Sequence, residues 1–215
     1  MEIYLIRHGT TLANEKRLYC GQTDIPLTEN GVSSILELKS ELKSKLKPEL
    51  KPELKSDLKP ELKSGLINQV KYPQNADMYF TTGLIRTEQT LDLIYGPVHR
   101  EALPKLAEYN FGSFEMKSHE ELNNSPEFRE DYQNWITDES GHTPCPGGES
   151  KKQFLARILA GYDELLKKSR SQGAEVVVLI CHGGVIAYLM DHMFPNERNF
   201  YEWQPKPGHG HMIHV

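Results

Sequence analysis

Cysteine and long apolar runs are both scarce in this 215-residue chain. The three cysteines, Cys20, Cys145 and Cys181, form no CxxC pair, so we expect reduced thiols in a cytoplasmic protein and neither a disulfide framework nor a zinc site. The longest apolar stretches, such as Val176–Cys181 and Val185–Met190, are far shorter than the roughly 20 residues that span a bilayer. The chain begins without a basic segment and a long apolar segment, so we do not expect export.

Charge of one sign is not in large excess either. The chain has 30 acidic and 25 basic residues, a formal net charge of −5, and 38% hydrophobic residues. This balance gives no whole-molecule electrostatic reason to bind nucleic acid or an anionic membrane, and we expect neither partner. The length is sufficient for a sizeable core, and we expect a single domain that spans residues 1–215.

A low-complexity run interrupts that domain between Glu37 and Ser64. It consists of seven tetrads, ELKS, ELKS, KLKP, ELKP, ELKS, DLKP and ELKS, with eight lysines against six acids. Leucine at every fourth position would wind around an α-helix, and the prolines disfavour a continuous helix. One interpretation is a solvated insertion in a surface helix. The other is an arm, residues 37–64, that binds a partner or a second copy of the chain through its leucines.

Strand and helix patterns alternate outside this run. Strands are predicted at Glu2–Arg7, Ala76–Phe80 and Glu175–Cys181. Helices are predicted at Leu84–Ile94, at Ser150–Ser169 and from Gly183 to about Met193, with Thr81 and Thr82 as N-caps of the first. The third strand is continuously apolar, which is typical of a strand buried on both faces of a parallel sheet. We therefore expect a three-layer α/β/α sandwich with a mostly parallel central sheet, and a ligand site at the carboxyl ends of its strands.

Two of the predicted strands end in similar sequences, LIRHG and LICHGG, which place His8 and His182 at strand ends. The glycines allow the backbone to approach a ligand closely, and the start of the helix after His182 favours an anion. Arg86 lies in the first turns of the helix that follows the second strand, and Arg7 precedes His8. Two arginines and two histidines around glycine-rich turns predict a site for a phosphoryl group, which arginine can bind through two N–H donors.

These residues belong to motifs that follow one another along the chain. In order, they are RHGTxxxN, GxTDxPLTxxG, LxRTxQT, LxExxFGxFE, PGGES and CHGG. The set resembles the histidine phosphatase superfamily, also called the phosphoglycerate mutase-like family. The resemblance covers the whole chain except the tetrad run, which lies where the family has an ordinary surface helix. It implies the phosphoglycerate mutase-like version of the α/β/α sandwich.

The resemblance also implies a mechanism. His8 is the expected nucleophile that forms a phosphohistidine, and it must be unprotonated to attack. Arg7 and Arg86 would disfavour a third positive charge, and a backbone carbonyl is expected to hold the other ring nitrogen of His8. Arg7, Arg86 and His182 would bind the three non-bridging oxygens and stabilise the transition state.

Further substrate contacts are expected from Asn14, Gln22, Thr23 and Gly183. No metal or other cofactor is expected, because the arginines supply the positive charge. Three histidines near the C-terminus could be read as a metal site, but alternation along a final strand is the preferred interpretation: His209, His211 and His214.

The resemblance places the proton donor at Glu108. Burial among neighbouring aromatic side chains would raise its pKa, as an acid that works near neutrality requires. Glu115, seven residues later, is a rival carboxylate to which we assign a structural role. Met116 stands where the family often has glycine, so it is expected to alter the turn of a lid or to fill part of the substrate pocket.

Two activities divide the family. A mutase returns the phosphoryl group to a second position of its substrate, whereas a phosphatase gives it to water. The resemblance implies that mutases carry an arginine directly after the acid glutamate, where this chain has Tyr109. Residues 117–146 also contain seven acidic side chains against two basic ones, which would repel a second phosphate. Phosphatase is therefore the preferred activity.

The layout resembles the α-ribazole phosphatase and broad-specificity phosphatase branch. The expected substrate is a small phosphorylated metabolite, with α-ribazole phosphate as one candidate. The alternatives are a phosphoglycerate mutase and a catalytically silent binding module of the same fold.

Overall fold

The computed structural model of the protein describes residues 1–45, 72–195 and 197–215. Within these residues five strands form one sheet: β1 (Glu2–Arg7), β2 (Met78–Thr81), β3 (Glu101–Ala102), β4 (Val176–Cys181) and β5 (Gly210–His214). The strand order is β3-β2-β4-β1-β5. β5 pairs antiparallel with β1, and the other neighbours are parallel, so the mostly parallel sheet is confirmed.

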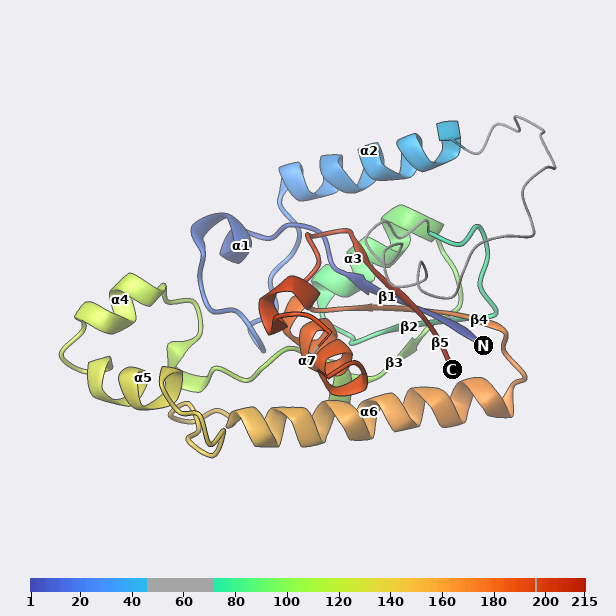
Figure 1. Ribbon diagram of the computed structural model, residues 1–215. Coiled ribbons are helices and arrows are strands. Elements are labelled where there is room, and N and C mark those ends of the chain that lie inside the picture. The colour runs from blue at the N-terminus through green and yellow to red at the C-terminus, as the bar shows by residue number, and fades with distance from the viewer. Residues whose placement is uncertain (46–71, 196) are drawn as a thin grey trace.

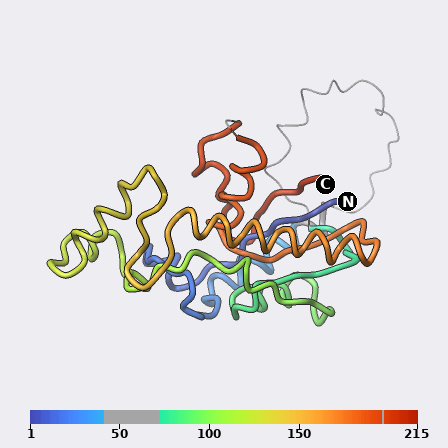
Figure 2. Tube along the Cα trace, turned by 90° about the horizontal axis from the view of Figure 1, so that it is seen from below, coloured from blue at the N-terminus to red at the C-terminus, as the bar shows by residue number. Residues whose placement is uncertain are grey.

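Helices cover both faces of this sheet, as Figure 1 shows. Helices α2 (Glu29–Lys45) and α3 (Ile85–Tyr95) lie on one face, and α6 (Lys151–Ser171) and α7 (Gly183–Met193) lie on the other. The three-layer α/β/α sandwich is therefore confirmed. The two ends of the chain lie side by side in Figures 1 and 2, and the amino group of Met1 donates to the carbonyl of Val215 at 3.0 Å.

The alternation of side chains along the central strands divides the core between the two faces. Ile3 and Leu5 of β1 pack in the cluster that contains α6 and α7, whereas Ile6 packs with residues of α2 and α3. Residues of β4 alternate in the same way, with Val178 and Ile180 on the α2–α3 side. Because β4 is buried on both faces, it has no polar position, which explains its continuous apolar run.

Short elements gather beyond the carboxyl ends of the parallel strands. They are α1 (Leu12–Lys16), α4 (His119–Asn124), α5 (Arg129–Ile136) and the 3-10 helices Pro104–Leu106, Gly112–Phe114 and Phe200–Trp203. Helices α4 and α5 project past the sheet at the left of Figure 1. Their base is held by packed aromatic rings: Tyr19, Tyr109, Phe111, Phe114, Tyr132 and Trp135. None of the described helices is long and apolar enough to cross a membrane.

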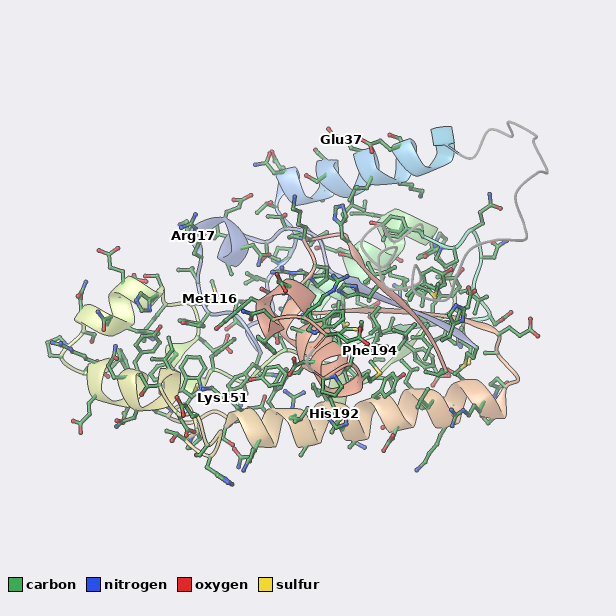
Figure 3. The ribbon with its side chains drawn as sticks, in the orientation of Figure 1. Arg17, Glu37, Met116, Lys151, His192 and Phe194 are labelled. Atoms are coloured by element: carbon green, nitrogen blue, oxygen red, sulfur yellow. The ribbon has the colours of Figure 1, made fainter. Side chains whose placement is uncertain are left out.

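The structure corrects one local prediction and leaves another untested. Thr81 and Thr82 do not cap α3, whose N-cap is Leu84. Thr81 is the last residue of β2, and the hydroxyl of Thr82 is hydrogen-bonded to His182. The first nine residues of the tetrad run continue α2 in helical form, and Glu37 points away from the sheet in Figure 3. The remainder of the run, residues 46–64, lies outside the described residues.

Candidate active site

His8 and His182 lie side by side because their strands are paired in register. Arg7 of β1 is opposite Cys181 of β4, and the backbone N–H of His8 donates to the carbonyl of Cys181 at 2.9 Å. The two strands therefore deliver the next residue of each chain segment to the same point. The imidazole centroids of His8 and His182 are 5.2 Å apart, and both rings are buried.

One ring nitrogen of His8 is already engaged. Its Nδ1 lies 2.7 Å from the carbonyl oxygen of Gly9, and a carbonyl can only accept, so Nδ1 carries the proton and donates. The lone pair of Nε2 is then the reactive position. Burial, followed by the positive charges of Arg86 and Arg7, lowers the pKa of His8 to about 3. The imidazole is therefore neutral at physiological pH, as a nucleophile must be.

His182 is completely buried, and its Nε2 lies 2.9 Å from the hydroxyl of Thr82. The hydroxyl of Thr82 also lies 3.3 Å from that of Thr87, which itself donates to the carbonyl of Leu84. One arrangement of these protons has Thr82 donating to Nε2 of His182. In that arrangement Nδ1 of His182 carries the proton, and this buried atom has no hydrogen-bond partner. Burial and the nearby arginines hold the pKa of His182 well below its usual value. The ring can therefore act as a neutral donor.

The two arginines approach His8 from different elements. Arg7 ends β1, and its Nη1 donates to the carbonyl of Pro205 at 2.8 Å, whereas its buried Nε has no partner. Arg86, in the first turn of α3, is 1% exposed and donates to the carbonyls of Thr23 and Gly21 at 2.9 and 2.6 Å. Neither guanidinium forms an ion pair within 4.0 Å with a carboxylate of the described chain. Their charge is thus available to an anion.

Glu108 follows the 3-10 helix Pro104–Leu106 and reaches the start of α7. Its carboxyl oxygens accept the backbone N–H of Tyr109 at 3.0 Å and that of Gly184 at 2.9 Å. Burial raises the pKa of Glu108, although these two hydrogen bonds and the arginines act in the opposite direction. A side chain at Gly184 would meet Oε1 of Glu108 at 2.4 Å, so glycine is needed for this approach. The direction of shift expected of a proton donor is confirmed.

The structure brings some of the other candidate residues to the site and not all of them. Asn14 accepts from the backbone and hydroxyl of Thr11 through its Oδ1, which leaves its NH2 group for the pocket. Gly183 lies against Arg7, where a Cβ would come within 3.0 Å of the guanidinium. Gln22 instead donates to the carbonyl of Glu108 at 2.8 Å, and the hydroxyl of Thr23 donates to Glu115 at 2.7 Å. Neither of these two side chains lines the pocket.

Glu115 has the structural contacts that we assigned to it. Its carboxylate accepts the backbone N–H groups of Gly21, Gln22 and Thr23 at 3.0 to 3.3 Å. The loop that contains these residues is therefore held by Glu115 on one side and by Arg86 on the other. Met116, the next residue, adopts a φ of 60°, a left-handed conformation that favours glycine. Met116 does not line the pocket.

Sequence reasoning missed a clamp on the backbone of Glu108. Arg157 of α6 donates to the carbonyls of Lys105, Ala107 and Glu108 at 2.8 to 3.0 Å, and it pairs with both carboxyl oxygens of Glu149. The carboxylate of Glu149 also accepts the N–H of Asn110 at 2.7 Å. A signal existed in the sequence, because Arg157 follows Glu149 of the PGGES motif by about two helical turns.

Together these side chains surround a pocket of about 220 Å³. Arg7, His8, Asn14, Arg86 and Glu108 line it, with Tyr19 and Phe111 at its apolar side. It contains a neutral nucleophile, two guanidiniums and a carboxyl with a raised pKa. Such a site can bind a phosphoryl group, attack it and protonate the oxygen that leaves.

The remaining candidates have ordinary structural surroundings. Cys181 ends β4 in the core, and burial raises the pKa of its thiol. His211 is buried and bonds to the carbonyl of Trp203 at 2.8 Å, while His214 is exposed, so the predicted alternation along a final strand is confirmed. Among the residues described, no group of three or more side chains is placed to hold a metal ion.

Comparison with known proteins identifies relatives along nearly the whole chain. Residues 3–59 and 66–209 match the histidine phosphatase superfamily (branch 1). The adenosylcobalamin/alpha-ribazole phosphatase of Salmonella typhimurium is 27% identical over 192 residues, 88% of this chain and 78% of that protein. The 2,3-bisphosphoglycerate-dependent phosphoglycerate mutase of Bradyrhizobium diazoefficiens is 30% identical over 87% of this chain and 78% of that protein.

Solved structures share the fold. The alpha-ribazole phosphatase of Shigella flexneri superposes with a TM-score of 0.67 at 23% identity, and covers 94% of this chain and 83% of its own. A structure from Thermus thermophilus described as phosphoglycerate mutase gives a TM-score of 0.58 at 24% identity, over 97% of this chain and 90% of that one. At such identities the likeness establishes the architecture.

Proposed function

The chain belongs to the histidine phosphatase superfamily and is a phosphatase, and we propose that it hydrolyses a small phosphorylated metabolite with His8 as the nucleophile. One observation carries this proposal: Nδ1 of His8 is fixed on the carbonyl of Gly9, so that Nε2 is unprotonated beside two unpaired guanidiniums. A phosphate dianion would satisfy the buried Nε of Arg7 and Nδ1 of His182, which otherwise lack partners.

The first step forms the phosphohistidine. Nε2 of His8 attacks phosphorus, and the bond between phosphorus and the leaving oxygen breaks. Arg7, Arg86 and His182 donate to the three non-bridging oxygens, and Asn14 adds a further donor. Glu108 transfers its proton to the leaving oxygen, which then departs as an alcohol.

The second step returns the enzyme to its starting state. Glu108, now a carboxylate, accepts a proton from a water molecule while the water oxygen attacks phosphorus. The bond between phosphorus and Nε2 breaks, inorganic phosphate leaves, and Glu108 is protonated again. Arg157 and Gln22 hold the carbonyl of Glu108 from two sides, and thereby keep its carboxyl in reach of both steps. We propose that neither step needs a metal, because the guanidiniums stabilise the phosphoryl charge.

We propose that a single domain spans residues 1–215 and is interrupted by the tetrad insertion at 37–64. We also propose that the protein is located in the cytoplasm, where its three cysteines stay free thiols. α-Ribazole phosphate is a candidate substrate because three relatives are named adenosylcobalamin/alpha-ribazole phosphatase. The second candidate activity is phosphoglycerate mutation, favoured by the 30% identity to the Bradyrhizobium enzyme. Against it, Tyr109 follows Glu108 and points to Glu149, to whose carbonyl it donates at 2.7 Å.

The test is hydrolysis of 4-nitrophenyl phosphate by the purified protein, with and without EDTA, alongside His8→Ala. We expect turnover that survives EDTA and is lost in His8→Ala, and an acid-labile, base-stable phosphoryl group on the wild type. Loss of activity on chelation would contradict the metal-free mechanism. An inert wild type that exchanges phosphate between positions of 3-phosphoglycerate would establish the mutase instead. If both assays are silent, the catalytically silent binding module becomes the better description.

A further inference from the structure

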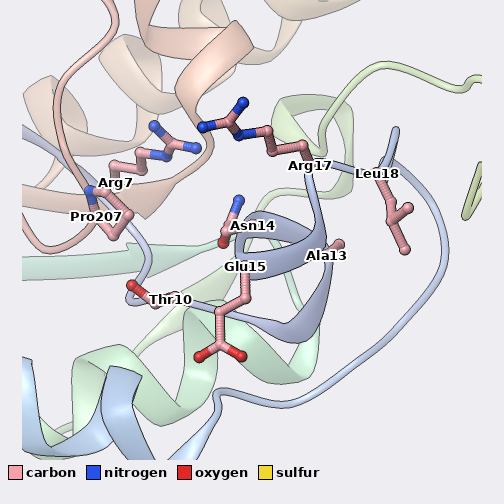
Figure 4. A pocket seen from close by; sticks show the side chains of 8 residues that line it. All are labelled: Arg7, Thr10, Ala13, Asn14, Glu15, Arg17, Leu18 and Pro207. Atoms are coloured by element: carbon pink, nitrogen blue, oxygen red, sulfur yellow. The ribbon is translucent and has the colours of Figure 1, made fainter. Parts of the chain in front are cut away.

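A second cavity adjoins the catalytic pocket. It has a volume of about 420 Å³ and shares Arg7, Asn14 and Leu18 with that pocket, so it extends the site outward past α1. Figure 4 shows its lining, with Arg17 at the end of α1 on the side opposite Arg7. A group bound to a phosphoryl on His8 can thus reach this second space.

The backbone of Arg17 is in a conformation that favours glycine. Arg17 terminates α1 with φ 54° and ψ 44°, and the N–H of Leu18 closes the helix end on the carbonyl of Ala13 at 2.9 Å. Helices commonly end in this left-handed form with glycine, because other side chains are strained there. Strain of this kind is concentrated at functional sites. The presence of arginine at this position therefore calls for a role of its side chain.

The guanidinium of Arg17 is directed into the cavity and has no charge partner. It is exposed and forms no hydrogen bond or ion pair with any residue that the structure describes. In Figure 4 it points toward the guanidinium of Arg7, with the amide nitrogen of Asn14 below them. Glu15 lines the same cavity, but its carboxylate accepts from the hydroxyl of Thr28 at 2.8 Å and points away from both arginines.

We propose that Arg17 forms a second anion subsite, and that the preferred substrate is a phosphomonoester with a second anionic group, a carboxylate or a phosphate. This inference rests on the proposed function, in which Arg7 binds the phosphoryl group that is transferred. Arg17 is then left for the second anion, to which a guanidinium can donate two hydrogen bonds. None of the acidic side chains of residues 117–146 lines this cavity.

The subsite distinguishes between candidate substrates. α-Ribazole phosphate carries one phosphate and no other anionic group, so the subsite disfavours it against a phosphorylated acid or a bisphosphate. Two matched pairs test this. In 3-phosphoglycerate and glycerol 3-phosphate the difference is a carboxylate, and in fructose 1,6-bisphosphate and fructose 6-phosphate it is a second phosphate.

The experiment compares kcat/KM within each pair for the wild type, Arg17→Gly and Lys16→Ala. Glycine suits the left-handed backbone, so Arg17→Gly removes the side chain without disturbing the end of α1. We expect the wild type to prefer the second anion by about tenfold or more in at least one pair, mainly through KM. The ratio should fall to near one in Arg17→Gly and persist in Lys16→Ala, which removes an adjacent charge that does not line the cavity.

The pair in which kcat/KM shows the preference identifies the second anion as a carboxylate or as a phosphate. A wild type without preference in either pair, or an Arg17→Gly variant that keeps the preference, overturns the subsite. The same pairs are titrated by calorimetry against His8→Ala, so the comparison does not depend on turnover. Hydrolysis of 4-nitrophenyl phosphate, which has no second anion, reports separately on the proposed function.

Discussion

At the residue scale, burial acts on His8 and Glu108 in opposite directions because their charged forms have opposite signs. It favours the neutral imidazole and lowers the pKa of His8 to about 3, and it favours the neutral carboxyl and raises the pKa of Glu108. Between these two pKa values, the nucleophile is free and the acid holds its proton. For an alkyl phosphate, kcat/KM should therefore stay high well below neutral pH and decline as Glu108 loses its proton.

Replacing Glu108 by glutamine tests the assignment of the proton donor. We expect kcat on an alkyl phosphate such as glycerol 3-phosphate to fall by about 10²- to 10⁴-fold, because the leaving alkoxide then receives no proton. With 4-nitrophenyl phosphate the first step needs no acid, but water still lacks its base. Rapid-mixing experiments should show a burst of one 4-nitrophenolate per enzyme followed by slow turnover.

Glu120→Gln is the matched control, since Glu120 is exposed on α4, away from the site, and undergoes the same substitution. It should retain the wild-type rate with both substrates. If Glu108→Gln hydrolyses the alkyl phosphate within a few-fold of the wild type, Glu108 is not the proton donor.

At the scale of elements, the loop 20–23 is a short segment stretched between two charged side chains. Arg86 of α3 holds its carbonyls, and Glu115 holds its N–H groups. A Cβ at Gly21 would lie 1.6 Å from the carbonyl oxygen of Tyr109, so the loop also packs against the segment that carries Glu108. The loop therefore couples the position of Arg86 to that of the proton donor.

Glu115→Gln is expected to weaken this loop without altering proton transfer. The amide cannot accept all the hydrogen bonds of the carboxylate, and bonds to a charged group contribute about 1.5–3 kcal/mol, so we expect a loss of about 1–3 kcal/mol in the free energy of unfolding. Urea unfolding measures this, with the exposed Glu130→Gln as control. The pH dependence of kcat/KM should keep its wild-type shape. A displaced alkaline limb would instead make Glu115 a participant in the chemistry.

Elements with a strong repeated pattern were predictable, and single contacts were not. The short apolar run of β1 and the continuous apolar run of β4 locate those strands correctly, because burial imposes the pattern on many residues at once. β3 has only two residues, so it has no period to detect. Gln22 and Thr23 carry polar groups suited to a substrate, but nearby acceptors of the chain itself bind them. Local sequence does not reveal which partner is closer.

The same limit applies to Thr82 and Arg157. A threonine between a strand and a helix predicts a cap, and only the pairing of β2 with β4 shows that His182 is within its reach. Arg157 on a long amphipathic helix resembles any solvated cation until the fold places Lys105 to Glu108 against it. By contrast, His8, Arg7 and His182 were found because strand ends in a parallel sheet meet at one edge.

At the scale of the whole molecule, the active site affects the response of the fold to acid. His8 and His182 are buried as neutral rings, and in the unfolded chain each would take up a proton near pH 6.5. Their contribution to stability is therefore complete above pH 6.5 and is lost as the pH falls toward their native pKa values, about 3 for His8. Glu108 opposes this, because its raised pKa stabilises the fold at low pH and that effect is lost as the pH rises.

His8→Asn isolates one of these protons. A group that binds a proton only when unfolded makes the free energy of unfolding fall by about 1.4 kcal/mol per pH unit, so the wild-type curve should be steeper than that of His8→Asn by about this amount between pH 6 and pH 4. Urea unfolding in phosphate-free buffers at several pH values measures both slopes. His192→Asn, at an exposed position of α7, should parallel the wild type. Equal slopes for the wild type and His8→Asn would mean that His8 is already protonated in the native enzyme over this pH range. That result would contradict the assignment of His8 as a buried, neutral nucleophile.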